Sequence, residues 1–127
     1  MTKLILIAAA GGAGSLLRFG LSGWAQKVGN SSFPLGTLLV NVLGCLMIGL
    51  LTALFTGPYP LREELRFAIL VGLLGGFTTF STFAWETTVL MNDGQWARAG
   101  MNILLSNVLG LGAAWWGYRM GQSCFGA

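Results

Sequence analysis

The chain has 127 residues, of which 54% are hydrophobic and only 9% are charged. Soluble domains carry about a quarter charged residues, so this composition indicates a membrane protein. Because one membrane-spanning helix needs about 20 apolar residues, the length allows four spans with short loops and excludes an additional soluble catalytic domain. We therefore predict a single all-α membrane domain over residues 1–127.

The residue types also argue against catalysis. Histidine is absent, and no cluster of acids or pairing of a nucleophile with a base occurs in the sequence. The usual proton shuttle and commonest metal ligand is therefore missing. Cys45 and Cys124 lie far apart, and nothing in the pattern pairs them. We expect neither an enzyme nor a nucleic-acid partner.

The first predicted span covers about residues 4–24, and Arg18 is its one charge. An arginine at this depth costs at least about 2.5 kcal/mol unless it snorkels to an interface or faces protein or water. Two interpretations stay open: snorkelling, or a positive charge that attracts anions at a pore mouth. Gly11, Gly12 and Gly14 keep this helix slim enough for close packing.

The second predicted span covers about residues 35–55 and has no charge. Thr37, Asn41 and Cys45 share one helical face. Asn41 is the most informative of them, because an amide in hydrocarbon needs hydrogen-bond partners. It either bonds a neighbouring helix, which contributes about 0.6 kcal/mol on average, or donates to a passing ion.

The third predicted span covers about residues 67–91 and contains the most unusual stretch, residues 72–83. Three glycines within five residues are followed by four hydroxyl side chains within five positions, a composition that favours bending or breaking a helix. Backbone freed at membrane depth must be buried in protein or line a wet cavity. This stretch is therefore the predicted functional site; the alternative is that its glycines only allow close packing. We expect Glu86, further along, to lie among headgroups or to pair with a basic side chain.

The fourth predicted span covers about residues 99–118, where Asn102, Ser106 and Gly110 share one face. Four spans place four basic side chains on one side of the membrane and two or three on the other. This bias is weak for the positive-inside rule, so insertion in both orientations is allowed. A symmetric dimer is the commonest assembly, and an antiparallel one would fit such a chain.

The polar side chains expected at membrane depth are amides and hydroxyls, with no acid among them. Such groups donate hydrogen bonds to anions, and the edges of aromatic rings carry partial positive charge. The pattern favours a pathway for a small ion, with a lean toward an anion. It does not identify the ion.

Over essentially its whole length, the sequence resembles the Fluc (CrcB) family of fluoride channels. The resemblance rests on three motifs: Gly11-x-x-Gly14-x-x-x-Arg18, Gly36-Thr37-Leu38-x-Val40-Asn41-x-x-Gly44, and Gly72-x-x-Gly75-Gly76-Phe77-Thr78-Thr79-Phe80-Ser81-Thr82-Phe83. It implies four spans with the third broken near its middle. It also implies an antiparallel, dual-topology homodimer in the lipid bilayer, with two pores for fluoride.

The resemblance also implies roles for individual residues. The implied fluoride pore comprises Asn41, Phe80, Phe83, Ser81, Thr82, Thr37, Asn102 and Ser106, with Arg18 as a vestibule charge. A structural sodium ion at the dimer centre would be held by the backbone carbonyls of Gly75 and Thr78. Span four is the least typical part, because Gly110 falls where some members carry a hydroxyl.

The function that we expect is a fluoride-selective channel in the bacterial inner membrane that passively lowers cytoplasmic fluoride. An alternative is a small four-span exporter of drugs or guanidinium coupled to protons. Those proteins need a carboxylate in the first span, where this chain has Arg18 and no acid. A third possibility is a non-transporting assembly subunit, in which glycines and asparagines serve only for packing.

Overall fold

The computed structural model describes residues 1–126, which form helices and no strands, as predicted. Two long helices come first and a third long helix comes last, with a row of shorter helical segments between them. In chain order the segments are α1 (Thr2–Gly29), α2 (Leu35–Thr56), α3 (Glu63–Phe67), the π-helix η1 (Ala68–Leu73), α4 (Leu74–Phe77), α5 (Phe80–Asn92) and α6 (Trp96–Phe125).

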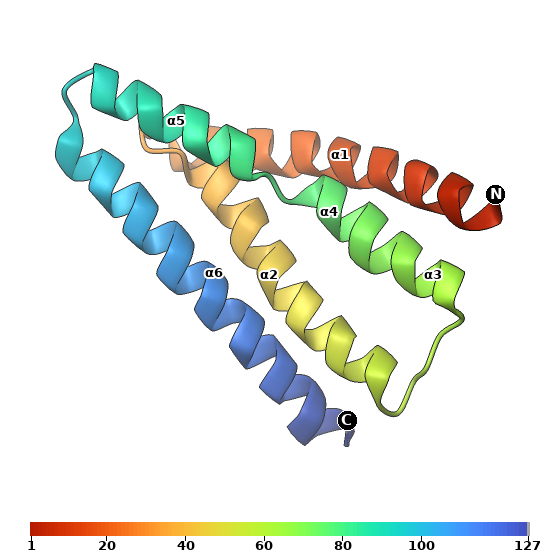
Figure 1. Ribbon diagram of the computed structural model, residues 1–127. Coiled ribbons are helices and arrows are strands. Elements are labelled where there is room, and N and C mark those ends of the chain that lie inside the picture. The colour runs from red at the N-terminus through yellow and green to blue at the C-terminus, as the bar shows by residue number, and fades with distance from the viewer. Residues whose placement is uncertain (127) are drawn as a thin grey trace.

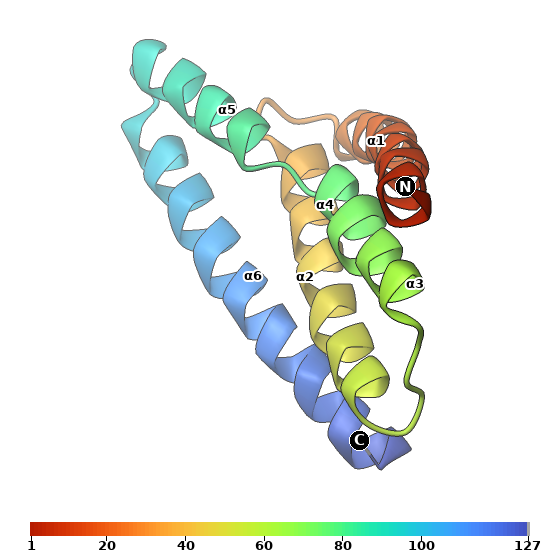
Figure 2. The same ribbon diagram turned by 45° about the vertical axis from the view of Figure 1, so that its right-hand side comes forward.

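The segments from α3 to α5 follow one another along one line that is interrupted between α4 and α5 (Figure 1). The helix α1 packs against η1 and α4, and α2 packs along α6 over much of its length. In the turned view α2 has α6 on one side, and α1, α3 and α4 on the other (Figure 2). By contrast, α5 makes few contacts with the rest of the chain.

Three helical stretches are long and apolar enough to cross a membrane: α1, α2 and the interrupted stretch Glu63–Asn92. The chain is therefore a multi-pass membrane protein. The helix α6 has 30 residues, about 45 Å at 1.5 Å per residue, but it is less apolar than these three stretches.

The turn after α1 differs from the prediction. The first span was predicted to end near residue 24, but α1 continues to Gly29, and Asn30 ends it in the left-handed conformation (φ 42°). Gln26 explains the difference, because its Nε2 donates to the carbonyls of Ser31 and Phe33 while its Oε1 accepts from the Gly36 amide. Gln26 makes these bonds to the turn from within the last turns of α1, so the helix extends beyond the predicted end of the span.

Glycines on α1 and in the central stretch let these two helices pack closely. A β-carbon at Gly14 would overlap the Leu73 carbonyl oxygen, and one at Gly76 would overlap the Gly11 carbonyl oxygen. The backbones of α1 and of the η1–α4 segment therefore touch. The packing interpretation is right for Gly14 and Gly76. It is wrong for Gly12 and Gly75, where a β-carbon would meet nothing within 4 Å.

Replacing Gly14 with alanine is expected to destabilise the fold by about 1–3 kcal/mol, the usual cost of adding a methyl group to a tightly packed site. The new methyl group would press on backbone, which cannot move aside as a side chain can. Thermal unfolding in detergent measures the effect. Gly12→Ala is the control, because a β-carbon there meets nothing within 4 Å. Equal melting temperatures for the two variants would contradict the prediction.

Candidate functional site

The helix break falls at two extended residues within the predicted stretch. The segment α4 ends at Phe77, after which Thr78 (φ −90°, ψ 158°) and Thr79 (φ −150°, ψ 111°) are extended. The segment α5 then begins at Phe80. The predicted break near the middle of this helix is confirmed.

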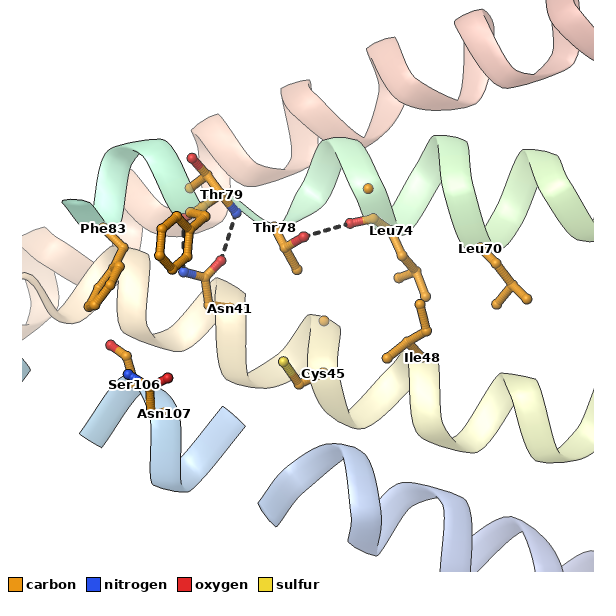
Figure 3. Close-up of a pocket in the computed structure, with 13 residues that line it drawn as sticks. Asn41, Cys45, Ile48, Leu70, Leu74, Thr78, Thr79, Phe83, Ser106 and Asn107 are labelled. Carbon is orange, nitrogen blue, oxygen red and sulfur yellow. Dashed lines mark hydrogen bonds between the residues drawn. The ribbon is translucent and has the colours of Figure 1, made fainter. Parts of the chain in front are cut away.

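Asn41 on α2 holds the break open. Its Oδ1 accepts a hydrogen bond from the Thr79 amide at 2.7 Å, and its Nδ2 donates to the Thr79 carbonyl at 3.0 Å (Figure 3). In an unbroken helix the Thr79 amide would instead bond to the Gly75 carbonyl four residues back. Asn41 thus diverts that donor, and the Gly75 carbonyl oxygen is released from its helical bond.

Thr79 does the same for the next turn. Its Oγ1 accepts from the Thr82 amide at 3.1 Å and so caps the start of α5. A continuous helix would direct the Thr82 amide to the Thr78 carbonyl. Two adjacent side chains, one from α2 and one from the break itself, therefore release two carbonyl oxygens.

Arg18 binds a third carbonyl at the same place. Its Nε donates to the Gly76 oxygen at 3.1 Å, and the side chain is half-buried. Arg18 therefore faces protein. Its hydrogen bond to the end of α4 offsets part of the free-energy cost of placing a charged side chain within a membrane span. Its predicted role as a vestibule charge stays a prediction.

A cavity of about 290 Å³ lies beside the break, between α2, η1, α4, α5 and α6. Six residues that were predicted to have individual roles line it, together with seven for which no individual role was predicted. The predicted ones are Asn41, Gly75, Thr78, Phe80, Phe83 and Ser106; the others are Gly44, Cys45, Ile48, Leu70, Leu74, Thr79 and Asn107. In Figure 3 Ser106 and Asn107 of α6 lie toward the ring of Phe83.

The remaining predicted pore residues lie outside this cavity. Thr37 is buried, and Asn102 is only 2% exposed, where it bonds to Thr87 of α5. The hydroxyl of Ser81 is exposed and 3.3 Å from the Thr79 hydroxyl, and that of Thr82 bonds to Thr79 at 3.0 Å. Within one chain these four residues lie near the cavity but do not form its wall.

The two phenylalanines of the site differ sharply in environment. Their ring centroids are 5.3 Å apart with a tilt of 52°. Phe83 is 8% exposed, whereas Phe80 is 77% exposed. Phe80 thus borders the cavity and at the same time stands on the outer surface of α5.

Glu86 lies at a second, smaller cavity of about 240 Å³, which Gln26 and Asp93 also line. Its Oε1 is buried without a hydrogen-bond partner. Within residues 1–126 the only ion pair joins Lys3 to Glu63. Of the two environments expected for Glu86, pairing with a basic side chain is not found among the described residues, and a position among headgroups stays a prediction.

Residues 5–118 match the model of the family described as CrcB-like protein, Camphor Resistance (CrcB). The chain belongs to the CrcB family. It is 45% identical over 122 residues to a protein of Maridesulfovibrio salexigens, a match that covers 96% of this chain and 97% of that protein. A protein of Nitratidesulfovibrio vulgaris is 43% identical over 96% of this chain and 98% of its own length. A protein of Parabacteroides distasonis is 43% identical over 97% of this chain and 95% of its own length. Each of these CrcB relatives is named "Fluoride-specific ion channel FluC".

Proposed function

We propose that this protein is a fluoride-selective channel that passively exports fluoride across the bacterial inner membrane and performs no enzymatic reaction. The observation that carries the proposal is the cavity beside the helix break. Amides, hydroxyls and aromatic rings line it beside aliphatic side chains, and none of its lining residues is acidic. The proposal that the ion is fluoride rests on the similarity, over nearly the full length, to proteins named as fluoride channels.

The chemistry of the lining suits a small anion. Fluoride gives up its water shell only in exchange for other donors, and it must bind weakly enough to leave again. Asn41 donates one of its two amide hydrogens to the Thr79 carbonyl, and the second remains available to donate to an ion. The edges of the phenylalanine rings add partial positive charge without a fixed charge. The Ser106 hydroxyl donates to Asn102, so it can donate to an ion only by leaving that bond. The other predicted pore residues would lie before or after the cavity along the path, or would hold its walls in place. They are Thr37, Ser81, Thr82 and Asn102.

We propose that two copies assemble as an antiparallel, dual-topology homodimer with two pores. Phe80 supports this, since a ring that borders the cavity is 77% exposed in a single chain. The sparse contacts of α5 with its own chain also support it. In this arrangement α6 is the fourth span, which agrees with its course along α2 (Figure 1).

The released carbonyls of Gly75 and Thr78 fit a structural sodium ion at the dimer centre. Sodium is a hard cation, and hard cations prefer oxygen ligands. A β-carbon at Gly75 would meet nothing within 4 Å, so this part of the break is open toward a neighbour. Two breaks that met on a two-fold axis would contribute four oxygens. Sodium bound there would stabilise the contact between the two copies.

The test is ion efflux from liposomes that contain the purified protein, read with a fluoride electrode. We expect rapid loss of fluoride and hardly any loss of chloride. Equal permeation of both anions would contradict the proposal. Cation uptake driven by a pH gradient, and abolished by Glu86→Gln, would instead favour the proton-coupled exporter.

A further inference from the structure

Thr87 lies one helical turn after Phe83 on α5 and is 5% exposed. Its hydroxyl makes two hydrogen bonds. It donates to the Phe83 carbonyl at 2.8 Å and accepts from the Nδ2 of Asn102 at 2.9 Å. This one oxygen atom therefore links the backbone of α5 to a side chain of α6.

The connection continues to the cavity. The Oδ1 of Asn102 accepts from the Ser106 hydroxyl at 3.4 Å, and Ser106 and Phe83 both line the cavity. A series of three hydrogen bonds thus begins at one wall of the cavity and ends at the backbone of the facing wall. Its two inner members, Asn102 and Thr87, are buried.

We propose that Thr87 is a positioning residue that fixes Phe83 relative to Ser106 across the cavity. Few other contacts could do so, because α5 packs sparsely against the rest of its chain. Without the Thr87 hydroxyl, the buried amide of Asn102 loses its acceptor, and an unsatisfied buried donor is costly. Asn102 then turns toward another partner and takes the acceptor of Ser106 with it.

The neighbouring residue Thr88 provides a matched control. Its hydroxyl donates to the Ala84 carbonyl at 2.9 Å, the same bond four residues back, but the side chain is exposed. Thr88→Val therefore removes the same local bond without touching a link between helices. Thr87→Val removes the local bond and the link to α6 together.

The first measurement is fluoride efflux from liposomes, and this arm rests on the proposed function. Thr87→Val is expected to slow efflux roughly tenfold, the upper range for one lost buried hydrogen bond. Thr88→Val is expected to stay within about twofold of the original, as exposed substitutions usually do. Thr87→Ser keeps the hydroxyl and is expected to restore the rate.

The second measurement does not depend on transport. 4-Fluorophenylalanine is incorporated at position 83, and its ¹⁹F NMR spectrum is recorded on detergent-solubilised protein in fluoride-free buffer. We expect the same single line for the unsubstituted chain, Thr88→Val and Thr87→Ser. For Thr87→Val we expect a shifted, broadened or split line, because Phe83 is no longer held in one position.

The outcomes separate the two claims. Spectra that respond as expected in a protein that passes no fluoride would overturn the proposed function and leave the positioning role standing. Identical spectra and equal efflux for Thr87→Val and Thr88→Val would overturn the positioning role. If Thr87→Val does not give a monodisperse protein, Thr87→Cys replaces it, because a thiol is a weaker donor and acceptor and should produce a smaller change of the same kind.

Discussion

Asn41→Leu is expected to lower fluoride efflux by about a hundredfold, the factor that corresponds to the loss of two buried hydrogen bonds. Leucine has a similar size but can neither accept from the Thr79 amide nor donate to the Thr79 carbonyl, as Asn41 does. Thr79 then either keeps two unpaired backbone groups at membrane depth or returns its amide to the Gly75 carbonyl. In both cases the geometry of the break changes.

Asn107→Leu is the comparison for this experiment. Asn107 also lines the cavity, but its Nδ2 donates to the Ile103 carbonyl of its own helix at 2.7 Å. This variant therefore removes an amide from the cavity without altering the break, and we expect a loss of only a few-fold. Equal losses for the two variants would mean that the number of amides matters, and not the bonds to Thr79. The readout is again the fluoride electrode.

Phe80→Ile is expected to abolish most of the fluoride efflux while leaving the chain folded. Isoleucine remains apolar but lacks the ring whose edge can meet an anion. Since Phe80 is 77% exposed in its own chain, the substitution removes little packing there. Efflux and gel filtration of the same preparation together separate a loss of conduction from a loss of folding.

Phe19→Ile serves as the control for the aromatic substitution. Phe19 is 80% exposed on α1 and does not line the cavity. We expect normal efflux from this variant. Unchanged efflux in both variants would contradict the role of Phe80 and would favour a subunit that does not transport.

The helices and the position of the break could be predicted because they depend on local composition. Long apolar runs indicate membrane helices, and glycines followed by hydroxyl residues indicate a weakness in the helix between residues 72 and 83. The sequence could not show whether those glycines break the helix or pack it. That distinction depends on α1, whose Gly11 carbonyl only the folded chain brings close to Gly76.

The contacts that shape the site were less accessible to prediction. Asn41 was considered either as a bond between helices or as an ion donor, and it does bond to the third helix. Its partner, Thr79, is 38 positions away, and no periodicity links the two. Thr87 gave no signal at all, because a threonine in a helix usually bonds to its own backbone, and its second bond requires the neighbouring α6.

The contact between Arg18 and Gly76 has an electrical consequence for the break. The helical stretch from α3 to α4 ends there with a partial negative charge of about one half, and α5 begins there with a similar partial positive charge. Arg18 places a full positive charge against the negative end. We therefore expect the start of α5 to be the positive side of the break, while the carbonyl oxygens released from α4 stay its negative side. An anion would be attracted to the α5 side although no charged side chain lines the cavity.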